Sequence, residues 1–210
     1  MAAHLPRTFY ARPAPAVAPD LLGHVLVRSR PDGSRLRARI VEVEAYEPYD
    51  RASHAFGGST ARNAVMFGPP GRLYVYFVYG MHHCMNVVTG PPGHGSAVLL
   101  RAAEPLEGLE DMARRRGQVA VRELCRGPGR WAEAFDADRT LNGADLVAGP
   151  DVWIERGRAP TDLLATVRIG VTRDAERRWR FVEEGSRWAS GPVRLSVSRP
   201  ARRARSRSSG

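Results

Sequence analysis

The chain has 210 residues, 43% of them hydrophobic and 26% charged, which is typical of one globular domain that buries a core and an enclosed pocket. Its 32 basic residues, all of them arginine, outnumber 22 acidic residues and give a formal net charge of +10, which favours a polyanionic partner such as DNA or RNA. Because the sequence contains no lysine, a lysine imine nucleophile and the lysine of a P-loop are excluded. Charge alone is equally compatible with plain solubility.

The two ends of the chain differ in composition from its middle. Residues 1–19 are rich in proline and alanine and are expected to form an extended segment along the surface. Residues 198–210 are mostly arginine and serine and are expected to be a disordered tail without a catalytic role. One domain is therefore expected over residues 20–197. The first residues lack the apolar stretch of a signal peptide, so a cytoplasmic protein is expected, at the nucleoid if the source is bacterial. The protein is expected to be a monomer.

A hairpin is predicted near the start of the domain. Strands at 24–28 and 36–44 are joined by Pro31-Asp-Gly-Ser34, a strong turn sequence. Strict alternation along the second strand would place Glu42 and Glu44 on the same inward face as its apolar residues. A carboxylate buried there requires a twist at the strand end, an arginine partner or a function that uses its burial.

The rest of the domain predicts more strands than helices. Strands are expected at 73–78, 81–88, 97–102, 152–155, 165–171, 179–182 and 193–197, and helices at 106–116 and 130–135. Because strands and helices are segregated along the chain, we predict an α+β fold built on a curved, mainly antiparallel sheet with surrounding helices. The uncharged run 73–100 is long enough to span a bilayer, but polar residues and Gly-Pro turns interrupt it, so we interpret it as buried strands and expect no membrane association.

Several side chains are candidates for chemistry. Arg101 lies inside an apolar strand and needs an anion, for which Glu44 is a candidate; together they could keep the carboxylate ionised and ready to accept a proton. The alternative is a purely structural ion pair, which is the commoner role of such a glutamate. Tyr79 lies at a predicted hairpin tip before Gly80, where an exposed aromatic ring could wedge between base pairs and fill the gap left by a flipped nucleotide.

Metal and redox chemistry find little support in the sequence. His82 and His83 are adjacent in a strand and should point to opposite faces, and no Cys-x-x-Cys or zinc-deaminase signature is present, so no metal is expected. Cys84 and Cys125 are too few for a disulfide framework and are expected to be buried free thiols.

Several collinear motifs extend this interpretation over roughly residues 20–197. They are Ile40-Val-Glu-Val-Glu-Ala-Tyr46, Arg62-Asn63, Met66-Phe67, Gly71-Arg-Leu-Tyr-Val-Tyr-Phe-Val-Tyr-Gly-Met81, Cys84-Met-Asn86, Val98-Leu-Leu-Arg-Ala-Ala-Glu-Pro-Leu-Glu-Gly108 and Leu124-Cys-Arg-Gly-Pro-Gly129. With them the chain resembles the alkyladenine (3-methyladenine) DNA glycosylase family. The resemblance implies a monofunctional base-excision-repair enzyme that acts on double-stranded DNA, releases alkylated or deaminated purines of the 3-methyladenine, 7-methylguanine, hypoxanthine and ethenoadenine class, and needs no cofactor.

The same resemblance implies a role for each matched residue. Glu44 looks like the general base, and Arg101 and the carbonyl of Val171 look like groups that hold its water. Tyr46, His54 and Tyr76 look like the walls around the flipped base, Asn86 like the residue that crowds the amino group of normal guanine, and Tyr79 like the intercalating residue. Thr60, Met66, Met81 and Arg130 fall at positions that face the DNA backbone.

Two other functions remain open on the sequence. A noncatalytic RNA- or DNA-binding module would use Glu44 and Arg101 only as a structural pair. A hydrolase of small nucleosides would not require an exposed aromatic ring at Tyr79.

Overall fold

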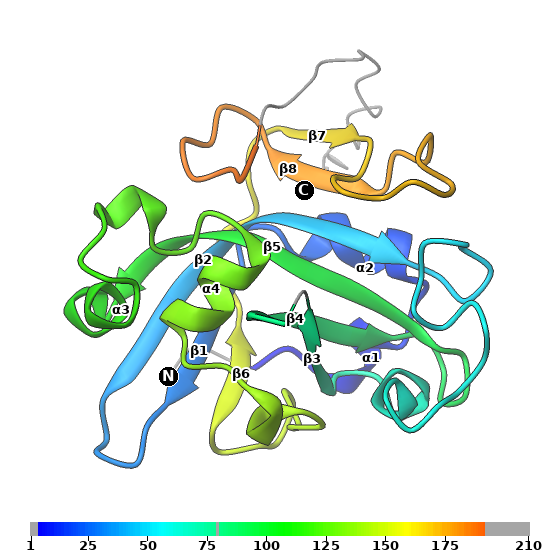
Figure 1. Ribbon diagram of the computed structural model, residues 1–210, viewed down its shortest axis with the longest axis horizontal. Helices are drawn as coiled ribbons and strands as arrows, with labels where there is room; N and C mark the ends of the chain where they lie inside the picture. Colours follow the sequence, from blue (N-terminus) through cyan, green and yellow to red (C-terminus); the bar gives the residue numbers. More distant parts are fainter. Residues whose placement is uncertain (1–3, 79, 192–210) are drawn as a thin grey trace, which may run out of the picture.

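The computed structural model describes residues 4–78 and 80–191, and its strands form one curved sheet (Figure 1). The described strands are β1 Val25–Ser29, β2 Arg35–Tyr46, β3 Leu73–Val78, β4 His82–Thr89, β5 Ser96–Glu107, β6 Val152–Glu155, β7 Leu163–Thr166 and β8 Arg180–Glu183. They follow the order β3-β4-β5-β2-β1-β6, and β8 pairs with both β2 and β7. Every one of these pairings is antiparallel, which confirms the predicted α+β class and the type of sheet.

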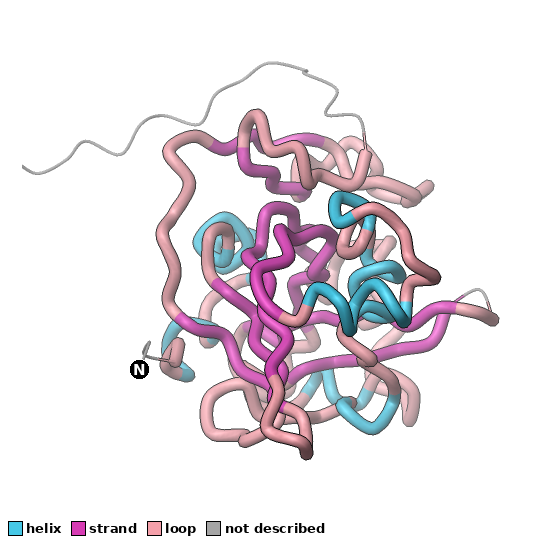
Figure 2. Tube along the Cα trace, turned by 90° about the vertical axis from the view of Figure 1, so that its left-hand side faces the viewer, coloured by secondary structure: helices cyan, strands magenta, loops and turns pink. Residues whose placement is uncertain are grey.

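The helices are short and lie around this sheet (Figure 2). They are α1 Arg7–Tyr10, α2 Ala14–Leu21, α3 Leu109–Arg115 and α4 Pro128–Ala134, with 3-10 turns at Ala64–Phe67, Val121–Glu123 and Arg139–Leu141. In the part of the chain that the structure describes, no helix combines the length and the apolar character that a membrane crossing requires.

The N-terminal segment differs from the extended surface segment that was expected. Helix α2 begins after Pro13 and tolerates Pro15 in its first turn, where a missing N–H removes no hydrogen bond. Tyr10, Val17 and Leu21 are fully buried in the main core. The proline content therefore marks the start of a short packed helix.

Most of the other expected elements are confirmed within one or two residues, with three exceptions. The strand expected at 97–102 is longer, because β5 runs from Ser96 to Glu107. The helix expected at 106–116 begins only at Leu109, because β5 continues to Glu107 and Pro105 pairs with Ala38 in the sheet. The strand expected at 165–171 ends at Thr166, and the chain continues as a loop. The strand expected at 193–197 lies outside the described residues.

Two insertions in the sheet determine which side chains face the pocket. Between β2 and β5, Val41 and Arg101 are each an extra residue without a partner in the register. An extra residue in a strand reverses the alternation of its side chains beyond that point. The two insertions lie beside each other, so β2 and β5 remain paired on either side of them. In both strands, the side chains beyond the insertion point to the opposite face of the sheet.

This change of face corrects the prediction for Glu42 and Glu44. The main core contains Leu36, Ala38 and Ile40 before the insertion in β2, and Val43 and Ala45 after it. Glu42 and Glu44 are fully buried, but on the opposite face from this core. The prediction from strict alternation was thus wrong, because the bulge at Val41 interrupts the alternation. No residue type in this stretch indicates that bulge.

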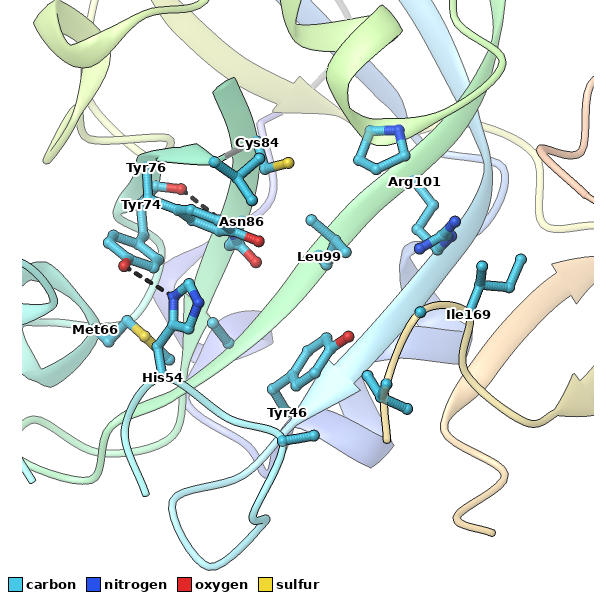
Figure 3. A pocket seen from close by; sticks show the side chains of 16 residues that line it. Tyr46, His54, Met66, Tyr74, Tyr76, Cys84, Asn86, Leu99, Arg101 and Ile169 are labelled. Carbon is cyan, nitrogen blue, oxygen red and sulfur yellow. Dashed lines mark hydrogen bonds between the residues drawn. The ribbon is translucent and has the colours of Figure 1, made fainter. Parts of the chain in front are cut away.

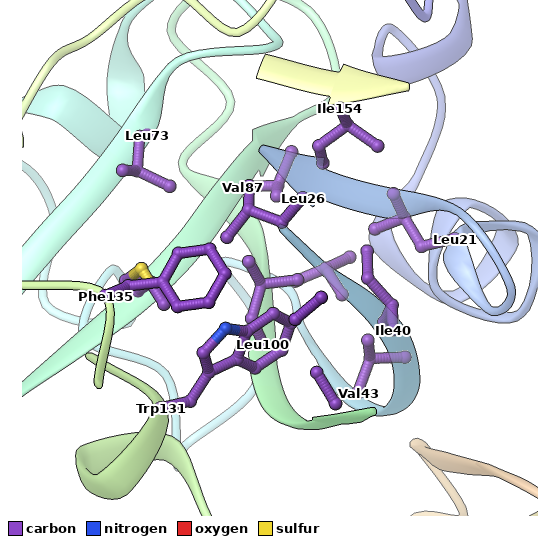
Figure 4. Close-up of a cluster of buried hydrophobic side chains, with 14 of the residues drawn as sticks. Leu21, Leu26, Ile40, Val43, Leu73, Val87, Leu100, Trp131, Phe135 and Ile154 are labelled. Atoms are coloured by element: carbon purple, nitrogen blue, oxygen red, sulfur yellow. The ribbon is translucent and has the colours of Figure 1, made fainter. Parts of the chain in front are cut away.

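The main core lies on the inner side of the curved sheet. Trp131 and Phe135, at and just after α4, point toward Leu100, and Leu21 of α2 approaches Ile40 from another side (Figure 4). Cys125 is buried in the same core, and both cysteines are free thiols as predicted. With one face of the sheet filled in this way, its other face is left to form a pocket.

Candidate functional site

A cavity of about 380 Å³ opens on the face of the sheet opposite the core (Figure 3). Its lining comes from β3, β4, β5, the end of β2, the 3-10 turn Ala64–Phe67, the start of α4 and two loops: Tyr46, Ala52, His54, Met66, Tyr74, Tyr76, Val78, Cys84, Asn86, Ala97, Leu99, Arg101, Pro128, Ile169, Gly170 and Val171. This volume falls in the range of about 300–1,000 Å³ that is usual for small-ligand sites. Every residue predicted for the base pocket, namely Tyr46, His54, Tyr76, Asn86 and Val171, lines this one cavity.

One wall of the pocket is a cluster of three aromatic rings. Tyr74 and Tyr76 are stacked with centroids 5.4 Å apart, and the His54 ring meets Tyr76 edge-on at 4.4 Å. His54 Nδ1 lies 3.2 Å from the hydroxyl of Tyr74. Burial, assisted by the charge of Arg62, lowers the pKa of His54 below its ordinary value, so this wall is uncharged at neutral pH.

Tyr46 lies across the cavity from this cluster, beside Ile169 and Arg101 (Figure 3). Burial and the neighbouring Glu44 carboxylate raise the pKa of Tyr46, and burial raises that of Tyr76. Both phenols are therefore neutral over the physiological pH range. The two walls offer flat aromatic surfaces on either side of one space.

Glu44 lies directly behind the wall that Tyr46, Arg101 and Ile169 form. Its Oε2 accepts hydrogen bonds from the Tyr46 hydroxyl at 2.9 Å and from Arg101 Nη1 at 3.3 Å, and its Oε1 accepts one from the backbone N–H of Ile169 at 2.8 Å. The carboxylate is fully buried, yet each of its three donors belongs to a residue that lines the pocket. Since a carboxylate offers about four acceptor positions, Oε1 keeps one that is not used.

Arg101 contacts two carboxylates instead of the single one that was expected. Its Nε donates to Glu42 Oε1 at 3.1 Å, in addition to the Nη1 contact with Glu44. Glu42 also accepts from Arg180 Nε at 2.7 Å and from both the backbone N–H and the hydroxyl of Ser190. Burial raises the pKa of Glu42, but Arg180 and Arg101 outweigh burial and bring that pKa below its usual value.

Sequence reasoning assigned no role to Glu42, Arg180 or Ser190. A weak signal existed for the first two, because Glu42 is two residues from Glu44 and Arg180 interrupts an otherwise aromatic and apolar stretch between Trp179 and Val182. No local signal connects Ser190 with either, because it arrives from a C-terminal loop. The network becomes visible only when β8 is paired with β2.

A short loop over residues 167–171 brings Ile169 to Glu44, and Arg168 anchors this loop. Arg168 forms a fully buried ion pair with Asp50, in which Nη2 donates to Oδ1 at 3.0 Å. Its guanidinium also lies over the rings of Tyr46 at 4.7 Å and Trp179 at 5.5 Å. The neighbouring Ile169 N–H is thus held in place by contacts on several sides.

Asn86 lies on the floor of the pocket beside Leu99, its partner in the strand register. Its amide nitrogen donates to the carbonyl of Tyr74 at 3.2 Å, which fixes the side chain across the β3–β4 pair. Val171 lines the pocket on the opposite wall, two residues beyond Ile169. The 167–171 loop contacts Glu44 through the backbone N–H of Ile169, which donates a hydrogen bond to the carboxylate.

The residues predicted to face a DNA backbone are divided by the structure. Thr60 and Arg130 are exposed, as is Met81 at 69%. Met66 differs, because its side chain is only 3% exposed and lines the pocket beside Ala55 and Tyr74. Tyr79, the predicted intercalating residue, lies outside the described residues.

Residues 4–78 and 80–191 contain no candidate metal site. There, no three or more His, Cys, Asp or Glu side chains are grouped so that they could hold a metal ion. The acidic groups nearest the pocket, Glu42 and Glu44, instead bind arginine.

The chain is similar in sequence to known proteins over most of its length. The sequence profile of the methylpurine-DNA glycosylase family matches residues 8–187. A protein of Streptomyces avermitilis is 52% identical over 185 residues, which cover 84% of this chain and 86% of the relative. A protein of Methanocella arvoryzae is 49% identical over 187 residues (87% and 93%), and one of Carboxydothermus hydrogenoformans is 46% identical over 188 (89% and 98%). All three carry the name "Putative 3-methyladenine DNA glycosylase".

Proposed function

We propose a mechanism for this chain, which belongs to the methylpurine-DNA glycosylase family and is a DNA-3-methyladenine glycosylase of base excision repair. In this proposal, a water that Glu44 activates hydrolyses the N-glycosidic bond of a flipped purine. The observation that carries the proposal is the position of Glu44. Its carboxylate is held by three donors, all from residues that line the pocket, and it keeps one acceptor position. A base fixed in this way fits proton abstraction from a water at the pocket wall.

The proposed steps follow from the positions of these groups. A water that donates to Glu44 and accepts from Arg101 attacks the anomeric carbon of the sugar as the bond to the purine breaks. Glu44 takes the proton of that water, and its negative charge also favours the oxocarbenium-like sugar. The Val171 carbonyl is proposed as a further acceptor for the same water. The products are the free base and an abasic site.

The aromatic walls support a flat substrate that carries positive charge. The base is proposed to lie between Tyr46 and the pair His54 and Tyr76. Because His54 is neutral at neutral pH, this wall does not repel an alkylated, cationic purine. Such a purine leaves readily without a partner acid, so a single carboxylate suffices. We propose 3-methyladenine and 7-methylguanine as substrates of this kind. Hypoxanthine and ethenoadenine are proposed as neutral substrates, and their release also requires a proton donor to the leaving base.

Delivery of the base is proposed to depend on residues around the pocket. Tyr79 is proposed to fill the gap in the duplex, and Thr60, Met81 and Arg130 are proposed to contact the DNA backbone. A chain without lysine has no route to a lysine imine, so strand cleavage by a lyase step is not expected. Cleavage of the strand before alkali treatment would contradict this part of the proposal.

The test is a base-release assay on a duplex that holds one hypoxanthine or ethenoadenine. Glu44→Gln keeps the size of the side chain and removes the basic charge, so it should abolish single-turnover excision while it leaves binding of the lesion in place. Glu155→Gln is the matched control, because Glu155 is a buried acid on β6, away from the pocket. A Glu44→Gln protein that excises at the wild-type rate would reject the proposal and favour a noncatalytic binding module.

A nucleoside hydrolase is distinguished by a second pair of measurements. Tyr79→Ser should impair excision from duplex DNA and leave cleavage of a free nucleoside unchanged. An enzyme of free nucleosides would instead show equal rates for both proteins and little activity on DNA.

A further inference from the structure

Four charged side chains form a connected network at one wall of the pocket and behind it. Glu42 and Glu44 of β2, Arg101 of β5 and Arg180 of β8 are between 0% and 7% exposed. The two negative and two positive charges compensate each other. Burial of a charged side chain is costly without such a partner of opposite charge. Only Glu44 and Arg101 have a place in the proposed reaction, so Glu42 and Arg180 need a separate explanation.

The contacts of Arg101 are divided between the two carboxylates. Nε lies 3.1 Å from Glu42 and Nη1 lies 3.3 Å from Glu44, whereas Arg180 approaches Glu42 to 2.7 Å. An arginine beside a single carboxylate prefers a bidentate pair, in which two N–H groups bind its two oxygens. Arg101 makes no such pair with Glu44, because its Nε donates to Glu42 and its Nη2 donates to the Ser190 hydroxyl at 3.4 Å, so that only Nη1 contacts Glu44.

Glu42 is itself fixed from the opposite side. Ser190 donates its backbone N–H to Oε2 at 2.5 Å and its hydroxyl to Oε1 at 2.9 Å, and Arg180 donates to Oε1 as well. The loop that carries Ser190 is fastened in turn, since Arg126 donates to the carbonyl of Ala189 at 2.9 Å. These contacts leave Glu42 little freedom to follow Arg101 toward Glu44.

We propose that Glu42 is a positioning residue, which draws Arg101 away from a bidentate pair with Glu44 and so keeps one oxygen of Glu44 available to the water. Arg180 neutralises the charge that Glu42 adds and prevents Glu42 from capturing Arg101 completely. This inference rests on the proposed function, because it assumes that Glu44 is the base. It assigns a role to a second buried glutamate that touches neither water nor substrate.

The charges that act on Glu44 can be named for each element around it. Glu42 and Tyr46 are its neighbours on β2, Arg101 faces it from β5, and Arg180 of β8 is its partner in the strand register. Tyr76 of β3 and Arg168 of the 167–171 loop also interact with its charge. Among these groups Glu42 is the only acid, so its removal leaves the carboxylate of Glu44 among cations and neutral phenols.

The experiment measures single-turnover excision of hypoxanthine from a duplex as a function of pH, for the full chain and four variants. Glu42→Gln should lower the rate about 10- to 100-fold, since a small displacement of a catalytic group has effects of this size. Its acid limb should move to lower pH, because an anion beside the base is lost. Arg180→Gln should move the acid limb in the opposite direction, because a cation is lost. Glu42→Asp keeps the charge and should lower the rate without moving the limb.

Glu44→Gln is the fourth variant and separates the two proposals. If it is inactive while both Glu42 variants excise at the wild-type rate, the positioning role is overturned and the proposed function stands. If Glu44→Gln is active, the proposed function fails first. A structural role for Glu42 predicts reduced thermal stability with the same acid limb in every protein, and that result would also overturn the inference. If the Glu42→Gln protein fails to fold, Glu42→Asp, which keeps the buried charge, is the remaining test, and a wild-type rate in that variant would overturn the positioning role.

Discussion

Arg168 and Asp50 form an ion pair in which both side chains are completely buried, and the residue after Arg168 donates its N–H to Glu44. The pair therefore links the stability of the protein to the geometry of its base. Asp50→Asn leaves the guanidinium buried without a counterion, a change that costs about 3–5 kcal/mol of unfolding free energy. We also expect a loss of excision of about tenfold or more at a temperature where the variant is folded, because Ile169 is no longer held against Glu44.

The measurement is urea unfolding together with single-turnover excision. Asp20→Asn is the matched control, since Asp20 pairs with Arg12 on the surface, where such a pair contributes below about 1 kcal/mol. A variant at Asp50 that is destabilised no more than the one at Asp20 would show that the buried pair does not hold the loop.

Parts of this site could be predicted from the sequence because their signals are local. The hairpin of β1 and β2 was predictable because a turn sequence separates its two strands. Arg101 was recognisable as a cation inside an apolar strand. The resemblance predicted that residues from separate segments of the chain, including Tyr46 and Asn86, share one pocket. These are features of residue type and order.

Other parts depend on partners that are distant in the sequence. The bulges at Val41 and Arg101 exist because two strands accommodate each other, and only their pairing shows that Glu42 leaves the core face. The donor from Ile169 is a backbone N–H, which every residue type except proline supplies, so its sequence carries no sign of the role. The start of helix α2 at Ala14 was not predicted, because prolines at a helix start resemble those of an extended segment.

Glu42 should contribute a stability that depends on pH. Its folded-state pKa is lowered from the ordinary value of 4.5, chiefly because Arg180 and Arg101 outweigh the effect of burial. The unfolded chain therefore binds the proton more readily. The contribution is present above pH 4.5 and is lost as the pH falls below 4.5 through the folded-state pKa.

Urea unfolding of the wild type should thus show a free energy that decreases below this pH with an extra slope of at most about 1.4 kcal/mol per pH unit. Glu42→Gln should be less stable at neutral pH and should lack this part of the slope. Glu176→Gln, at an exposed acid, serves as the control and should follow the wild type. Parallel curves for the wild type and Glu42→Gln would contradict the assignment.

His54 should respond to the charge of Arg62 without direct contact between the two side chains being required. Burial is the main cause of its lowered pKa, and Arg62 adds to it. Arg62→Gln should therefore raise the pKa of His54 part of the way back toward 6.5, as followed by NMR of the imidazole ring. Arg12→Gln removes a charge from a different part of the surface and should leave the His54 titration in place. An unchanged titration in Arg62→Gln would leave burial as the whole cause.

Asn86 should control which purines the pocket accepts. Its side chain is 5% exposed, lies on the pocket floor and is tied to the Tyr74 carbonyl, so it cannot turn away from a base that carries an additional exocyclic amino group. Asn86→Ser removes the amide and opens space at this position. Relative to hypoxanthine, excision of 7-methylguanine should increase by about tenfold or more, since one small group in a tight pocket is worth roughly 1–3 kcal/mol.

Met66→Leu is the control, because it changes a different part of the lining with nearly the same volume and should alter excision of both substrates alike. Competition between the two lesions in one reaction measures the ratio directly, and a ratio equal in Asn86→Ser and wild type would show that the floor of the pocket does not select the base.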